Sequence, residues 1–176
     1  EGQGSISDRI TEGQKAAIIT NKTPFYATMG GQQGDRGEIS GENSLFIVDE
    51  TIHLQGGKIA HLGVMDQGEI SLNEKVHLSV DEEARNLTAR NHTATHLLQK
   101  ALKTVLGSHV EQAGAYYDDK RLRFDFTHFA ALTKDELQKV EEMVNQEIAK
   151  GELVKTEEMS LEDAKKSGAI ALFGEK

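Results

Sequence analysis

Short runs of apolar residues, bounded by turn-forming residues, mark the first half of the chain. Lys15–Thr20 (KAAIIT) and Ser44–Asp49 (SLFIVD) have this form, which predicts β-strands. Further strand candidates are His53–Leu54, Ile59–Leu62 and Lys75–Val80. Ten of the 17 glycines lie between positions 13 and 68, and the Gly-Gly pair at 56–57 predicts a hairpin turn. Residues 1–83 are therefore predicted to form a small β-barrel-like domain.

The hydrophobic pattern changes to helical spacing near Asp81. From Ala84 to Leu106 apolar residues recur at helical intervals with no Gly or Pro between them, which predicts a helix. Gly107 is expected to end that helix. Arg121–Phe126 (RLRFDF) then alternates charged and apolar side chains, as a half-buried strand does.

Two more helices are predicted beyond that strand. Thr133 and Glu136 have the spacing of a capping box, which predicts a helix running through Ile148. A short helix is expected over Leu161–Lys166. Residues 84–176 are thus predicted to form an α+β domain, and the fold class of the whole chain is α+β.

Charge limits the kind of nucleic-acid contact that the chain can make. The formal net charge is -9, which argues against broad nonspecific binding, since that needs many cationic contacts. A local basic patch is still compatible with this total. The candidate patch consists of Lys100, Lys103, Lys120, Arg121 and Arg123. A solvated charged face explains these residues as well as phosphate contacts do.

Composition narrows the cellular setting. The chain contains no cysteine, so it can form no disulfide and offers no thiolate ligand to a metal. No apolar run approaches the roughly 20 residues that a membrane helix needs. We expect a cytoplasmic location and no membrane partner.

The sharpest local signal is the histidine pair of the sequence His92-Thr-Ala-Thr-His96. Residues four apart share one face of a helix, so both imidazoles have the spacing of helix-borne metal ligands. The metalloprotease pattern is excluded, because Thr93 stands where that motif needs glutamate. The structural alternative is two polar side chains on a solvated or core-facing surface. Two nitrogens are only half a zinc site, and His109 and His128 are weak candidates to complete it.

Two further segments could line a site. The glycine-rich stretch from Thr23 to Gly37 allows close approach of a ligand, although it lacks the Gly-Lys-Ser/Thr ending of a phosphate loop. Its alternative reading is a series of tight β-turns. Gln112, in the segment SHVEQAG, could direct an amide into the same cavity or be an exposed side chain.

Four segments occur together and in one order. They are TPFYATMGGQQGDRGEI from Thr23, RNHTATHLLQKAL from Arg90, SHVEQAG from Ser108, and RLRFDF from Arg121 followed by His128. This ordered set resembles the linker and editing region of alanyl-tRNA synthetases. The free-standing AlaX-type editing proteins share the pattern, and the editing domain of threonyl-tRNA synthetase is more distantly similar.

The resemblance implies an activity. Alanyl-tRNA synthetases attach alanine to tRNA(Ala) using ATP and Mg²⁺, and a separate domain hydrolyses wrongly attached serine or glycine. A synthetic pocket for alanine rejects near-isosteric side chains poorly, so a second hydrolytic site is needed. The implied partner is tRNA(Ala), and the implied metal is Zn²⁺.

The resemblance also implies roles for single residues. His92 and His96 match the first two zinc ligands of the family. Thr95 matches a residue that recognises the misplaced amino acid; its alternative is a hydroxyl bonded back to the preceding helical turn. Gln112 matches a glutamine of the editing pocket. The loop near the tRNA acceptor end is matched by Gly30, Gly31 and Gln32.

Departures from the family pattern define what else the chain could be. The remaining zinc ligands, in a Cys-x-x-x-His motif, are expected after Lys176, so the editing domain is expected to be incomplete and this half site to bind zinc weakly. Ala115 follows the SHVEQAG segment where the family often has serine, and no carboxylate stands in a motif position for a general base. The alternatives are an AlaX-type trans-editing deacylase and a noncatalytic tRNA-binding module.

Overall fold

The structure, a computed structural model, describes residues 6–155 and 157–168. Both strands and helices are present, so the α+β class is confirmed. The chain divides into two compact units, Glu1–Thr95 with Gly114–Phe124, and His96–Ala113 with Asp125–Lys176. The predicted domain boundary after residue 83 stays a prediction.

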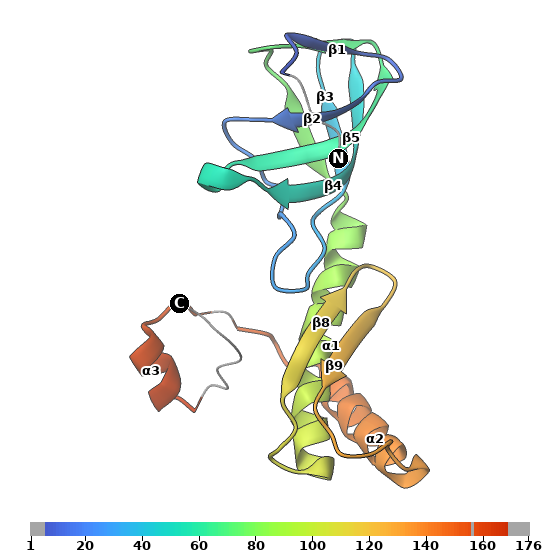
Figure 1. The fold of residues 1–176 in the computed structure, drawn as a ribbon, viewed down its shortest axis with the longest axis vertical. Helices are drawn as coiled ribbons and strands as arrows, with labels where there is room; N and C mark the ends of the chain where they lie inside the picture. The colour runs from blue at the N-terminus through green and yellow to red at the C-terminus, as the bar shows by residue number, and fades with distance from the viewer. Residues whose placement is uncertain (1–5, 156, 169–176) are drawn as a thin grey trace. The chain divides into compact units, whose positions relative to one another are not determined.

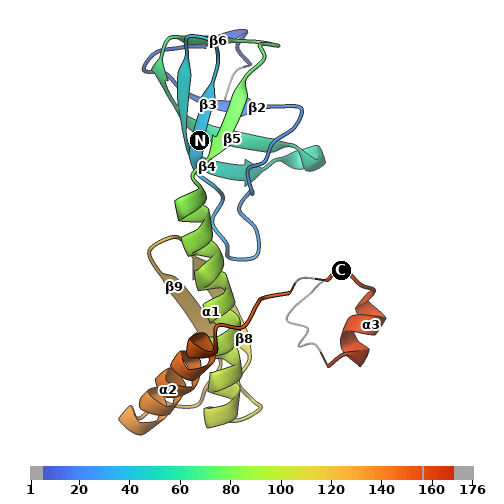
Figure 2. The same cartoon turned by 180° about the vertical axis from the view of Figure 1, so that it is seen from behind.

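The main sheet of the first unit is antiparallel and open. Its five strands run in the spatial order β2-β5-β4-β3-β7, and Figures 1 and 2 label β2, β3, β4 and β5. Their bounds are Lys15–Ile19 for β2, Gly37–Ser40 for β3, Leu45–His53 for β4, Ile59–Gln67 for β5 and His77–Val80 for β7. Within the described part of the chain no ladder joins β2 to β7, so the expected barrel is not closed.

The inward side chains of these strands form one core. Phe46 and Val48 of β4 are buried against Ile39 of β3 and Met65 of β5, and Phe25 joins them from the loop before β3. Alternation of inward and outward positions explains why Leu45–His53 forms a strand. The sequence had suggested two separate runs here. They form one strand because a register shift between Val48 and Glu50 absorbs the break in alternation.

Three short strands of the first unit, β1, β3 and β6, were not predicted. β1 (Arg9–Thr11) pairs with β6 (Glu69–Ser71). These segments, like β3, have only three or four residues and include charged or small side chains. Their strand state depends on the partner strand, which a local pattern cannot show. The predicted glycine turn is confirmed, because the 3-10 turn Gln55–Gly57 connects the antiparallel strands β4 and β5.

The long helix α1 spans Glu82–Leu106 and contributes to both units. It begins two residues earlier than predicted, because the Asp81 carboxylate accepts the backbone N–H of Ala84 (3.0 Å) and caps the first turn. Gly107 follows its last residue with φ +119°. A hairpin of β8 (Gln112–Tyr117) and β9 (Leu122–Phe126) comes next. β9 was predicted and β8 was missed.

The second unit contains α2 (Lys134–Lys150) and α3 (Leu161–Lys166). Both halves of the capping box predicted at Thr133 and Glu136 are present, and Gly151 ends α2 in the left-handed conformation. Buried apolar residues of this unit are Ala101, Leu102, Val110 and Val140. In the described ranges, no helix combines the length and apolar character needed to cross a membrane.

Candidate functional site around His92

The glycine-rich loop between β2 and β3 is anchored by an ion pair between a buried aspartate and a partly exposed arginine. Asp35 is 7% exposed, and its carboxylate accepts the backbone N–H of Tyr26 (2.6 Å) and pairs with the guanidinium of Arg85 on α1. Arg85 also donates to the carbonyl of Pro24 (2.6 Å). Both ends of the loop are therefore fixed to the first turn of α1, beside which the loop runs (Figures 1 and 2).

Two pKa values are shifted at this ion pair, that of Arg85 itself and that of the nearby Tyr26. The hydrogen bond that Arg85 donates to the Asp35 carboxylate raises the pKa of Arg85, against the opposing effect of burial. Burial raises the pKa of Tyr26, and the negative charge of Asp35 adds to that effect. The pair was not predicted, because its members are 50 positions apart in the sequence.

The tip of the loop pairs with β8 through backbone groups. Tyr117 donates its N–H to the carbonyl of Gly31 (3.0 Å), and its carbonyl accepts from Gln33 (3.1 Å). The Tyr117 hydroxyl donates to the carbonyl of Gly30 (2.8 Å). Gly31 has φ +87°, and a side chain there would overlap the carbonyl of Ala115. Only glycine suits that position.

Gln32 connects the loop to the histidine predicted as a metal ligand. Its Oε1 lies 2.9 Å from Nδ1 of His92, whose ring is half-buried. The His92 ring also lies against the Tyr117 ring, with centroids 4.6 Å apart. The sequence marked the loop and His92 as separate candidates, and the structure places them in contact. The expected contact of Gly30, Gly31 and Gln32 with tRNA stays a prediction.

His96 lies one turn after His92 on α1, and its side chain is exposed. The two therefore have the predicted i, i+4 spacing. Among residues 6–155 and 157–168, no group of three or more His, Cys, Asp or Glu side chains could hold a metal ion. Structural and catalytic zinc sites take three or four protein ligands, so these two histidines could supply at most half of one, and the expected Zn²⁺ site stays a prediction.

Thr95 and Gln112 were predicted to recognise the amino acid. Thr95 is 5% exposed, and its hydroxyl donates to the carbonyl of Asn91 (3.0 Å). This is the back-bonded arrangement that was the structural alternative, and the oxygen keeps lone pairs that can accept a hydrogen bond. Gln112 is half-buried at the start of β8. Both recognition roles stay predictions.

The five cations of the candidate patch are divided between the units. Lys120, Arg121 and Arg123 belong to the β8–β9 hairpin of the first unit, whereas Lys100 and Lys103 lie on α1 within the second. The Arg121 guanidinium lies 5.5 Å from the centroid of the Tyr116 ring. A single patch of all five therefore stays a prediction.

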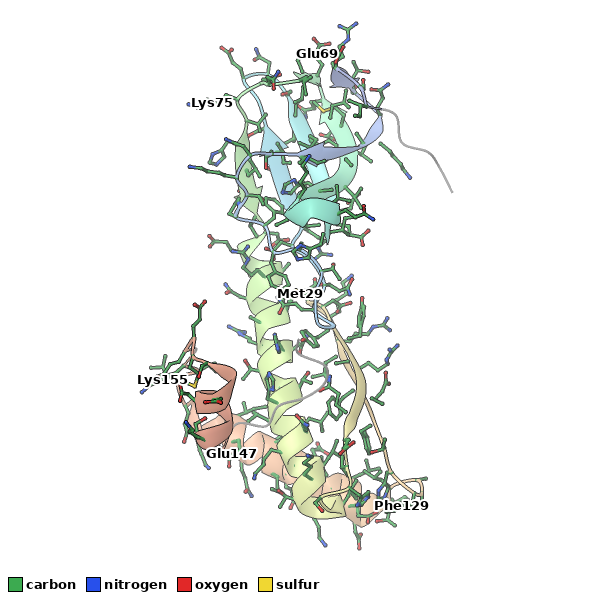
Figure 3. All side chains as sticks on the ribbon, turned by 60° about the vertical axis from the view of Figure 1, so that its left-hand side comes forward. Met29, Glu69, Lys75, Phe129, Glu147 and Lys155 are labelled. Atoms are coloured by element: carbon green, nitrogen blue, oxygen red, sulfur yellow. The ribbon has the colours of Figure 1, made fainter. Side chains whose placement is uncertain are left out.

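The two histidines considered for completing the metal site form a separate pair in the second unit. Nε2 of His109 and Nδ1 of His128 are 2.9 Å apart. The His109 ring also stacks on Phe129, with centroids 4.3 Å apart. The Phe129 side chain, labelled in Figure 3, is 85% exposed. Sequence reasoning missed this pairing.

Comparisons with known proteins agree on one kind of enzyme. Residues 2–84 match the family model described as tRNA synthetases class II (A). An alanine–tRNA ligase 1 of Lachnoclostridium phytofermentans is 58% identical over 97% of this chain, and an alanine–tRNA ligase of Lysinibacillus sphaericus is 46% identical over 98%. The chain spans only 20% and 19% of these relatives.

Proposed function

Because this chain belongs to the alanyl-tRNA synthetase family, we propose that it serves an enzyme that attaches alanine to tRNA(Ala) with ATP in the cytoplasm. The observation that carries this proposal is the 58% identity to an alanine–tRNA ligase over 171 residues. Identity at that level over nearly the whole chain supports a shared role for this region.

Within that enzyme, we propose that this region takes part in hydrolysing tRNA(Ala) charged with serine or glycine. His92 and His96 would hold Zn²⁺, with further ligands from a Cys-x-x-x-His motif of the longer protein. A bound zinc would supply Lewis acidity for orienting or activating water at the ester. The Gln32–His92 hydrogen bond supports this role, because ligating histidines usually donate their second ring N–H to an oxygen.

The other predicted residues would select the substrate. The lone pairs of the Thr95 hydroxyl could accept a hydrogen bond from the hydroxyl of a misplaced serine, and the amide of Gln112 could contact the aminoacyl group. Arg121, Arg123 and Lys120 are exposed and would neutralise tRNA phosphates.

The decisive experiment compares the 176-residue chain with the longer protein that contains it. Zinc content and deacylation of Ser-tRNA(Ala) are measured for both. We expect about one zinc and rapid hydrolysis in the longer protein only, both lost in His92→Ala and His96→Ala. ATP-dependent formation of Ala-tRNA(Ala) separates a synthetase from a free-standing deacylase. Stoichiometric zinc and full hydrolysis by the 176-residue chain would contradict the half-site assignment.

A further inference from the structure

We propose that Gln32 is a positioning residue that fixes the protonated nitrogen of His92, and that Tyr117 holds Gln32 in place. The inference rests on the proposed function in one respect only, the role of His92 as a zinc ligand. The arrangement itself depends on contacts within the first unit, all made by described residues.

The hydrogen bond between Gln32 and His92 selects one imidazole tautomer. An amide oxygen can only accept, so Nδ1 of His92, 2.9 Å from Oε1 of Gln32, must donate. The lone pair of the neutral ring is then on Nε2. A free imidazole has no such fixed choice, and a ligating histidine needs its lone pair on the nitrogen that faces the ligand site.

The backbone around Gln32 is held tightly enough to aim its side chain. Met29 and Gln32 exchange both backbone hydrogen bonds, at 3.2 and 3.0 Å. The two residues between them, Gly30 and Gly31, have φ of +60° and +87°. Positive φ at both central positions is the signature of a tight reverse turn that glycine favours. The turn sets the direction in which the Gln32 side chain leaves the loop, whose tip is marked by Met29 in Figure 3.

Tyr117 fixes this turn from the other side. Its backbone N–H and its hydroxyl donate to the carbonyls of Gly31 and Gly30, at 3.0 and 2.8 Å. Its ring lies against the imidazole of His92, with an interplanar angle of 32°. The buried Tyr117 side chain thus contacts both the His92 ring and the turn that carries Gln32. Burial raises the pKa of Tyr117, with a smaller contribution from Tyr26, so the hydroxyl keeps its proton at neutral pH.

The test is nitrogen NMR of the full 176-residue chain with labelled histidine. We expect the His92 resonances to show a protonated Nδ1 and an unprotonated Nε2. Gln32→Met keeps the length of the side chain and removes the acceptor, so it should shift His92 toward the Nε2-protonated form. Gln32→Glu restores an acceptor and should restore the original tautomer. Tyr117→Phe removes only the hydroxyl and should give an intermediate shift.

Matched controls come from the neighbouring residues. Gln33→Met alters the adjacent glutamine, which pairs with Tyr117 through its backbone, and Tyr116→Phe removes a hydroxyl that donates to Asp118 instead. Both should leave the His92 resonances unchanged. A protonated Nε2 in the unmodified chain, or an unchanged tautomer in Gln32→Met, would overturn the inference.

A second measurement uses the longer protein that contains this chain. There, Gln32→Met should weaken zinc binding about 10- to 100-fold, the range seen when second partners of ligating histidines are removed, whereas Gln33→Met should not. The tautomer is read without any substrate, so a failure of this inference is distinguishable from a failure of the proposed hydrolysis. Equal zinc affinity in Gln32→Met and the unmodified protein would count against a positioning role.

Discussion

At the scale of single residues, His61 shows how a polar side chain can be built into an apolar core. It is fully buried, and both ring nitrogens have partners: the carbonyl of Ile18 at 2.8 Å and the hydroxyl of Thr23 at 2.7 Å. The Phe25 ring packs edge-on against it, with centroids 5.0 Å apart. These contacts suit a neutral ring that donates once and accepts once.

The neutral state of His61 predicts a pH dependence of folding stability. Burial lowers its pKa in the folded chain, against the effect of the Ile18 carbonyl, while the unfolded chain retains about 6.5. The unfolded state therefore binds the proton first. As the pH falls from about 6.5 toward the lower pKa of the folded state, the free energy of unfolding should decrease by at most about 1.4 kcal/mol per pH unit.

Urea unfolding at a series of pH values tests this expectation. His61→Asn should flatten the dependence, and His77→Asn, at an exposed strand position, should preserve it. Equal slopes in the unmodified chain and His61→Asn would show that another group is responsible.

Thr95 provides a second prediction at this scale. Thr95→Val keeps the shape of the side chain and removes a hydroxyl that donates within its own helix. We expect a change of about 0.5 kcal/mol or less in unfolding free energy, because such back-bonding adds little to helix stability. In the longer protein, discrimination between Ser-tRNA(Ala) and Ala-tRNA(Ala) should fall by about 1–3 kcal/mol if a buried hydrogen bond to serine is lost. Unaltered discrimination in a deacylation assay would remove Thr95 from the recognition site.

At the scale of elements, the Asp35–Arg85 pair ties the glycine-rich loop to α1. Arg85→Met should leave the Asp35 carboxylate buried without its cation and lower the free energy of unfolding by about 3 kcal/mol. This is the lower end of the range for a broken buried pair, because the Arg85 side chain is 37% exposed. Urea unfolding measures the loss. Arg90→Met, at an exposed position of the same helix, is the control and should change stability by about 0.5 kcal/mol or less.

The reverse turn at the loop tip allows a comparison of two adjacent glycines. Gly30→Ala and Gly31→Ala both place a side chain at positive φ, which costs roughly 1–2 kcal/mol. The Gly31 side chain would in addition overlap the Ala115 carbonyl, whereas nothing lies within 4 Å of one at Gly30. Gly31→Ala should therefore be the more destabilising change in a thermal unfolding experiment. Equal losses would show that β8 does not hold the turn.

The elements differ in how well the sequence predicts them. α2 was predicted because its start depends on two residues close in sequence, Thr133 and Glu136, which form the reciprocal hydrogen bonds of a capping box. β8 was missed because its sequence, QAGAYY, begins with small and polar residues. Its strand state comes from pairing with β9 and the loop tip, which no local pattern encodes.

At the scale of the whole molecule, the charge of -9 sets a limit on tRNA binding. Affinity should fall as salt rises, with a slope of nearly one per phosphate contacted. Reversing Lys120 and Arg121 to Glu should lower the affinity and reduce that slope by about 2. Lys58→Glu, at an exposed position between β4 and β5, is the charge control. A filter-binding titration in which both variants behave alike would dismiss the hairpin cations as a phosphate site.

The candidate site was predictable in its parts but not in its assembly. Helical spacing placed His92 and His96 on one helix, and the resemblance marked the glycine-rich loop. The contact of Gln32 with His92 joins residues 60 positions apart, and no such role was predicted for Tyr117. Pairings of this kind follow from tertiary packing, so a pattern read along the chain cannot supply them.

The hydroxyl bond from Tyr117 to Gly30 also bears on how the protein is made, because it closes 87 positions of chain. During synthesis the glycine-rich loop leaves the ribosome well before β8 does, so its contacts with Tyr117 cannot form until β8 has emerged. Such distant contacts form late, after the entropy of closing the intervening chain has been overcome. The nascent sheet can therefore pack first, and the contacts around His92 are completed only after the β8–β9 hairpin has formed.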